Sequence, residues 1–178
     1  MKRLMETMKL EEGKVTICNI PFIITFTKSI YYTQKELENV LGEKWRKVSY
    51  DSGKTDALAC YSSYIKSSRF APFIKYLVSN GAASFKFCVE EFNKMGKGRL
   101  EIMNEDANIP KFLVRLYFSP IALAYLEHHG TSKPVCHHIA GIFAGAGLIN
   151  YPGIEATETK CMAKGDPYCE FVIEIPKK

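Results

Sequence analysis

Four side chains in the last third of the chain are of types that could bind a metal ion together: Cys136, Glu158, Cys161 and Cys169. Three thiolates and one carboxylate suit tetrahedral zinc, which accepts sulfur, imidazole nitrogen and carboxylate oxygen. If all four converge on one ion, the protein fills every coordination position, and such closed sites are structural rather than catalytic.

The spacing of these residues leaves alternatives open, because seven residues between Cys161 and Cys169 do not make one of the familiar short zinc motifs. The two cysteines could instead form a cross-strand disulfide or remain free thiols. An imidazole of His137 or His138 could replace Glu158 as the fourth ligand. Neighbours on a helix point about 100° apart, however, so His137 would not readily share a metal with Cys136.

The elements that must position the four residues are a helix and a hairpin. We expect a helix from Pro134 to about Leu148, which would carry Cys136. Residues 153–161 and 168–175 flank a Gly-Asp-Pro turn signal, so they should pair as two strands. This hairpin would bring Cys161 and Cys169 together near its loop, with Glu158 close by.

The predicted helix is unusually rich in small residues, with glycine at positions 141, 145 and 147. Each glycine weakens a helix by roughly 1 kcal/mol relative to alanine. Their presence indicates either close approach of another backbone, with tight packing on a sheet favoured, or room for a ligand.

Upstream of this region, residues 111–118 form the strongest predicted strand, with Phe112, Val114, Leu116 and Phe118 on one face and Arg115 on the wetter face. Further strands are expected at residues 14–18, 22–27 and 99–103. A short helix should begin at Ser119 and Pro120.

Helices are also expected in the N-terminal half of the chain. The first would begin at Thr33, with Glu36 as its capping-box partner, and contain Gly42 as a weak spot or a close contact. Asp51-Ser52-Gly53 could interrupt or bend the pattern before residues 57–65. A third stretch, residues 70–93, could break in two at Asn80-Gly81.

Together these elements predict the α+β class, with an antiparallel sheet and helices mainly on one face. A length of 178 residues suits a single domain, 1–178. Within it we expect N-terminal strands or an arm (1–32), a helical part (33–94), and a part containing the sheet and the metal site (95–178).

Composition narrows the classes of function. The net charge of +5 comes from 24 basic and 19 acidic residues that are interspersed, so no basic stripe favours nucleic-acid binding. No run approaches the roughly 18 apolar residues of a membrane span, and the N-terminus lacks a secretory signal. We therefore expect a cytoplasmic protein, in which cysteines stay reduced. Cys18, Cys60 and Cys88 are expected to be small buried hydrophobes.

The segment from Cys136 to Gly147, together with Glu158-Thr-Lys-Cys161-Met-Ala-Lys-Gly165-Asp-Pro-Tyr-Cys169-Glu-Phe171, resembles the 4-vinyl reductase-like domain family. That family includes archaeal stand-alone proteins and sensor domains of phenol-responsive activators, and it is related to TRAPP vesicle-tethering subunits. The close match covers about the last 45 residues. The resemblance implies a TRAPP-subunit and nitric-oxide-signalling-and-Golgi-transport-like ligand-binding fold, commonly homodimeric, around a hydrophobic pocket.

In the phenol sensors a Cys, Glu, Cys, Cys set binds zinc beside the pocket, and the resemblance carries this role to Cys136, Glu158, Cys161 and Cys169. The pocket would be lined by Phe112, Val114, Leu116, Ala140, Phe143 and Ala144. The tryptophan and histidine that recognise phenol in the sensors have no counterpart here, since Trp45 lies far upstream and no histidine precedes His128.

The sequence therefore predicts a zinc-containing, sensor-like module that binds a small hydrophobic molecule such as a hydrocarbon, as a homodimer without a membrane span. One alternative is a reductase acting on vinyl tetrapyrroles, but no hydride-donor site is visible, so a binding role is preferred to an enzymatic one. The other is a dimeric assembly module, in which the apolar helices of residues 37–92 form the interface.

Overall fold

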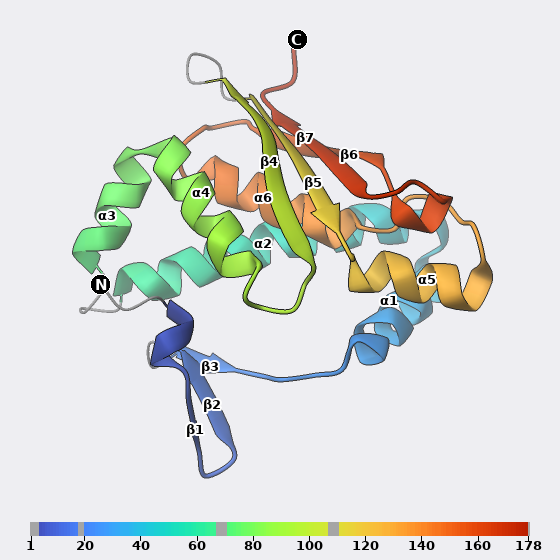
Figure 1. Ribbon diagram of the computed structural model, residues 1–178, viewed down its shortest axis with the longest axis horizontal. Helices are drawn as coiled ribbons and strands as arrows, with labels where there is room; N and C mark the ends of the chain where they lie inside the picture. Colours follow the sequence, from blue (N-terminus) through green and yellow to red (C-terminus); the bar gives the residue numbers. More distant parts are fainter. Residues whose placement is uncertain (1–3, 18–19, 67–70, 107–110, 178) are drawn as a thin grey trace.

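The structure is a computed structural model that describes residues 4–17, 20–66, 71–106 and 111–177. Its main sheet has the strand order β4-β5-β7-β6, with every neighbouring pair antiparallel. The strands are β4 (Arg99–Asp106), β5 (Lys111–Tyr117), β6 (Glu155–Lys160) and β7 (Cys169–Glu174). This architecture confirms the predicted α+β class (Figure 1).

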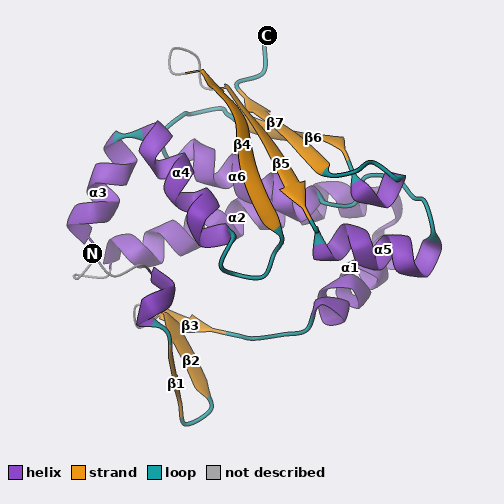
Figure 2. Cartoon of the chain, in the orientation of Figure 1, coloured by secondary structure: helices purple, strands orange, loops and turns teal. Residues whose placement is uncertain are grey.

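Six α-helices accompany the sheet in the described part of the chain: α1 (Thr27–Leu41), α2 (Trp45–Lys66), α3 (Ala71–Ser79), α4 (Gly81–Phe92), α5 (Pro120–His129) and α6 (His137–Leu148). Figure 2 shows α6 crossing behind the sheet, with α2 running beside it. The helices thus lie mainly on one face, as predicted. Among the described helices none is long and apolar enough to cross a membrane.

The inward face of β5 forms the centre of the core. Phe112, Val114 and Leu116 are all buried, whereas Arg115 points to the other face and pairs with Glu170 at 3.0 Å. The prediction for Phe118 is wrong, because its side chain is 64% exposed. The strand ends at Tyr117, and Phe118 adopts a φ of 58° where the chain turns into α5. As predicted, Ser119 caps α5, accepting a hydrogen bond from the N–H of Ala122 at 3.3 Å.

The glycines of α6 pack against α2. A Cβ on Gly141 would collide with the carbonyl oxygen of Tyr50, and one on Gly145 would lie 2.5 Å from that of Lys54. In return, a Cβ on Gly53 would collide with the carbonyl oxygen of His138. Close approach of another backbone is therefore confirmed, but the packing is helix on helix rather than helix on sheet. Gly53 also does not interrupt its helix, since α2 runs unbroken through it.

The N-terminal helix starts earlier than expected. α1 begins at Thr27, so Thr33 lies inside it and donates its hydroxyl to the carbonyl of Ser29 instead of capping. Gly42 has a φ of 54° and ends α1; a Cβ added there would meet none of the described residues within 4 Å, so close packing does not explain it. The expected break at residues 80–81 is confirmed, because Asn80 separates α3 from α4 and accepts a hydrogen bond from the N–H of Ala83.

A separate three-stranded ribbon precedes α1. It consists of β1 (Lys9–Glu11), β2 (Lys14–Ile17) and β3 (Ile20–Phe22), paired in that order. The strand expected at residues 22–27 is wrong beyond Phe22, because the following residues form an extended connection to α1 (Figure 1). Ile17 anchors the ribbon in a small apolar cluster with Leu77 of α3.

Two of the remaining cysteines differ from expectation. Cys60 and Cys88 are half-buried rather than buried, and the sulfur of Cys88 lies 2.9 Å from the hydroxyl of Tyr61. Cys18 lies outside the described residues.

Candidate metal centre

A β-bulge in β6 places Glu158 and Cys161 on the same side of the sheet. Glu158 pairs with Phe171 and Lys160 pairs with Glu170, so Thr159 is an extra residue in β6. In a regular strand residues three apart face opposite sides. The bulge shifts this alternation by one, and both potential ligands consequently face the helices.

The turn after β6 brings Cys169 back to Cys161. A short 3-10 helix, η3 (Met162–Lys164), leads into Gly165, whose φ of 93° suits glycine. The N–H of Cys161 donates to Oδ2 of Asp166 at 2.8 Å, which fixes the turn. The predicted hairpin is thus confirmed.

Cys136 comes from the other side of the site, at the start of α6. The helix begins at His137, so Cys136 is its N-cap rather than a helical residue as predicted. Its N–H donates to Oε2 of Glu158 at 3.0 Å, and its sulfur lies 3.4 Å from the hydroxyl oxygen of Ser119. Ser119 is a member of the site that sequence reasoning assigned only to helix capping.

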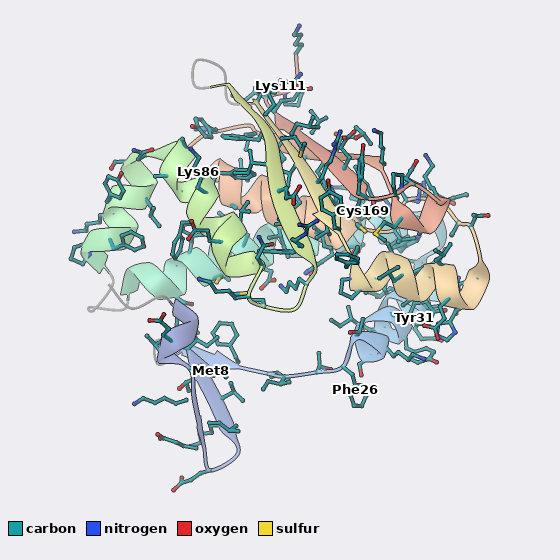
Figure 3. All side chains as sticks on the ribbon, viewed as in Figure 1. Met8, Phe26, Tyr31, Lys86, Lys111 and Cys169 are labelled. Atoms are coloured by element: carbon teal, nitrogen blue, oxygen red, sulfur yellow. The ribbon has the colours of Figure 1, made fainter. Side chains whose placement is uncertain are left out.

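One potential ligand atom from each of Cys136, Glu158, Cys161 and Cys169 lies within 4.8 Å of all the others. The three cysteines are fully buried. The sulfur of Cys169 is 3.6 Å from that of Cys136 and 4.0 Å from that of Cys161. A disulfide would require about 2.05 Å, so the disulfide alternative is wrong for this structure. Figure 3 labels Cys169 where the hairpin lies beside β5 and the start of α5.

The electrostatics of the cluster favour a bound cation. Burial, followed by the neighbouring Cys161 thiol, raises the pKa of Glu158 to about 9. The thiols of Cys136 and Cys161 donate hydrogen bonds to Cys169 and lower its pKa to about 5. Oε1 of Glu158 is buried and has no hydrogen-bond partner among the described residues. A divalent cation at this place would stabilise the ionised forms of all four groups and satisfy that oxygen, so the residues fit a metal ion.

The histidines considered as alternative ligands point elsewhere. The ring of His137 packs edge-to-face against Trp45, with centroids 4.9 Å apart, and burial lowers its pKa. His138 lies 3.8 Å from Asp56 of α2. Within the described residues the cluster therefore has Glu158, and not an imidazole, as its fourth member.

The residues expected to line a ligand pocket lie together in the main apolar core: Phe112, Val114, Leu116, Ala140, Phe143 and Ala144. All six are buried. Phe112 stacks on Phe85 at 4.4 Å, and Phe143 packs edge-to-face on Phe171 at 5.1 Å. Phe85 and Phe171 were not assigned to the pocket from sequence, although Phe171 occupies an inward position of β7 that alternation could have identified.

Comparison with known proteins gives a family match for the part of the chain that contains the metal cluster. Residues 123–175 match the model of the vinyl-4-reductase domain family. Two uncharacterised proteins of Methanocaldococcus jannaschii are 49% and 44% identical over 45 residues, which are 23% and 25% of this chain. The matched segments span only 19% and 26% of those relatives.

Solved structures share the fold over most of the chain. The phenol-responsive sensory domain of the transcription activator PoxR, with phenol, superposes with a TM-score of 0.78 at 18% identity, covering 97% of this chain and 86% of that one. A trafficking protein particle complex subunit 3 of Naegleria fowleri, covalently bound to palmitic acid, gives 0.57 at 12% identity, with coverages of 85% and 95%.

An H-NOX protein of S. oneidensis in the Fe(II)NO state gives a TM-score of 0.55 at 13% identity, covering 89% of this chain and 80% of that one. These likenesses confirm the fold predicted from sequence. Residues 123–175 therefore belong to the vinyl-4-reductase domain family, within a fold shared with a sensory domain, a trafficking-complex subunit and an H-NOX protein.

Proposed function

We propose that this protein is a sensor-like module that binds a small hydrophobic molecule next to a structural zinc ion. The observation that carries the metal part is the convergence of three thiols and one carboxyl within 4.8 Å, at a place where Oε1 of Glu158 is buried without a partner among the described residues. Leaving a carboxylate oxygen buried and unsatisfied costs more than about 1 kcal/mol, which metal coordination would recover.

Zinc is the proposed ion because soft thiolates with one carboxylate in a tetrahedral set suit it best. With four protein ligands, its role is to fasten the start of α6 to the β6–β7 hairpin. Free thiols at this place fit the proposed cytoplasmic, reducing location.

The test of the zinc proposal is elemental analysis combined with native mass spectrometry of the purified protein. We expect one zinc per chain, and none in the variant carrying both Cys161→Ser and Cys169→Ser. The double variant Cys60→Ser and Cys88→Ser is the matched control, because neither cysteine belongs to the cluster, and it should retain the zinc. A metal-free wild-type protein with normal stability would overturn the proposal.

The ligand is proposed to be apolar and to bind between β5 and α6. Support comes from the side chains there, which are the phenyl rings of Phe112 and Phe143 and the methyl groups of Ala140 and Ala144, all buried. The phenol-bound sensory domain has the same fold, but the apolar lining here favours a hydrocarbon-like molecule over a phenol.

Mass spectrometry of organic extracts from the purified protein would identify a co-purified ligand. Added ligands can be tested by thermal shift, with toluene or decane compared against phenol. We expect the apolar probes to raise the melting temperature and Ala144→Leu, which fills the proposed space, to abolish the shift. Equal shifts in wild type and Ala144→Leu would contradict this location.

Assembly as a homodimer is a second proposal, favoured by apolar side chains that the single chain leaves exposed. They lie on the connection before α1 and on α1 itself: Ile23 (90% exposed), Ile24 (72%), Phe26 (79%) and Val40 (78%). Figure 3 shows Phe26 pointing away from the rest of the molecule. Light scattering across micromolar concentrations should give twice the chain mass, and a monomer throughout would remove this proposal.

A further inference from the structure

Helix α2 lies outside the metal cluster found in the described part of the chain, yet it contacts both elements that the cluster joins. Those elements are α6, through its N-cap, and strand β6. On the α6 side, Gly141 approaches the backbone of Tyr50 and Gly145 approaches that of Lys54 so closely that a Cβ would not fit without a shift. These backbone contacts leave α6 little freedom to slide along α2.

The same two residues of α2 use their side chains to hold β6. The hydroxyl of Tyr50 donates a short hydrogen bond to Oε2 of Glu155 and accepts one from the N–H of Ala156 at 3.0 Å. The ammonium group of Lys54 lies 2.9 Å from Oε1 of Glu155. Tyr50 and Lys54 therefore connect α6, through their backbones, with β6, through their side chains.

These contacts matter for the cluster because β6 is an edge strand. Among the described strands it pairs with β7 alone, so the N–H groups on its other side need a different partner. The Tyr50 hydroxyl takes that role at Ala156, two residues before Glu158 and just ahead of the bulge that aims Glu158 and Cys161 inward. An edge strand held only from one side would leave the bulge, and hence both ligands, freer to move.

We infer that Tyr50 is a positioning residue for the metal centre, acting with Lys54 to fix the distance between β6 and α6. This inference rests on the proposed metal function. Both residues act through Glu155 and Ala156 rather than by bonding to the four ligands. Their effect is to hold Glu158 and Cys161 at the place that Cys136 occupies from the other side. The bound ion should consequently leave faster when the link from α2 to β6 is cut.

The experiment compares Tyr50→Phe with Tyr61→Phe. Both substitutions remove one hydroxyl from a partly buried tyrosine of α2, but the Tyr61 hydroxyl bonds to Ser84 and Cys88, away from the cluster. Co²⁺-loaded proteins are mixed with excess chelator, and loss of the thiolate-to-cobalt absorption is followed. Groups that orient metal ligands are typically worth about 10–100-fold in metal affinity. We therefore expect roughly tenfold faster loss from Tyr50→Phe and no change in Tyr61→Phe.

A second pair covers the case in which Tyr50→Phe does not fold. Lys54→Met removes the other contact to Glu155, and Lys47→Met, which breaks an exposed ion pair with Asp51 on the same helix, is its control. Faster cobalt loss from Lys54→Met alone supports the inference.

The possible failures are distinguishable. Wild-type protein that binds neither zinc nor cobalt overturns the proposed metal function and the inference with it. Wild-type protein that binds metal, with loss rates equal in each variant and its control, overturns only the positioning role. A merely structural role would lower the thermal stability of both tyrosine variants alike and leave cobalt loss unchanged in both.

Discussion

The backbone N–H of Cys136 donates a 3.0 Å hydrogen bond to Oε2 of Glu158, while Oε1 of the same carboxyl is buried and finds no partner in the described part of the chain. One oxygen is thus already held by the helix N-cap, and the other is left for an ion. The carboxyl is oriented before any ion arrives, since its rotation would break the hydrogen bond to Cys136. Such pre-orientation is typical of ligands supported by a second partner.

Glu158→Gln should weaken metal binding while keeping the fold. The amide oxygen can still accept the hydrogen bond from Cys136, but it is neutral and a poorer zinc ligand. We expect a roughly 10–100-fold lower zinc affinity, measured by competition with a chromophoric chelator. Thr157→Val, an exposed position on the same strand, serves as the control. Unchanged affinity in Glu158→Gln would show that the carboxylate is not a ligand.

Removal of the metal should lower the thermal stability of the wild-type protein. Without the ion, the start of α6 and the hairpin are joined mainly by weak thiol contacts and the Cys136–Glu158 hydrogen bond. For a chain of this size each 1 kcal/mol corresponds to about 2–4 °C in melting temperature, so we expect a fall of at least about 5 °C on adding a strong chelator.

The control for chelation is the variant with Cys161→Ser and Cys169→Ser, whose melting temperature should not respond to chelator. Scanning calorimetry measures both proteins. A chelator effect of equal size in the two would indicate that it acts somewhere other than at this cluster.

Gly141→Ala should destabilise the protein by separating α6 from α2. The new methyl group would meet the carbonyl oxygen of Tyr50, which is backbone and cannot move aside cheaply. Overpacking of this kind costs about 1–3 kcal/mol, although alanine is the better helix former by about 1 kcal/mol. We expect a net loss in urea unfolding, whereas Ser63→Ala on the exposed part of α2 should change stability little. A stabilised Gly141→Ala protein would contradict the close packing.

The contribution of Glu155 to stability should depend on pH in the acid range. Burial alone would raise its pKa, but hydrogen bonds from Tyr50 and Lys54 outweigh burial and hold the pKa below its ordinary value. A carboxyl with a depressed folded-state pKa stabilises the protein above its unfolded pKa, and this contribution is lost as pH falls through the folded pKa.

The measurement is the difference in unfolding free energy between wild type and Glu155→Gln. It should be constant from neutral pH down to about 4.5, near the ordinary pKa of a glutamate, and shrink as the pH falls further. Because both proteins lose metal in acid, the comparison is made with metal-free samples. A difference that grows on acidification would have the wrong sign for this network.

Local patterns in the sequence were sufficient to predict the elements around the cluster. Alternation of apolar residues in β5, the Ser-Pro start of α5 and the Gly-Asp-Pro turn act over a few residues, and each predicted feature is present. The start of α1 was misplaced because Thr33 and Glu36 match a capping box that the longer helix does not use. A cap pattern in the interior of a helix has the same sequence as one at its start.

Sequence by itself determined the residue types of the cluster, the hairpin that joins Cys161 to Cys169, and the inward face of β5. Only the tertiary structure decided that Glu158 faces the cysteines, because a bulge at Thr159 reverses the alternation that spacing alone would imply. It also decided that the glycines of α6 serve contact with α2, and that Tyr50 and Lys54 reach β6. These relationships join residues far apart in the chain, and no local periodicity encodes which of many possible surfaces such residues will share.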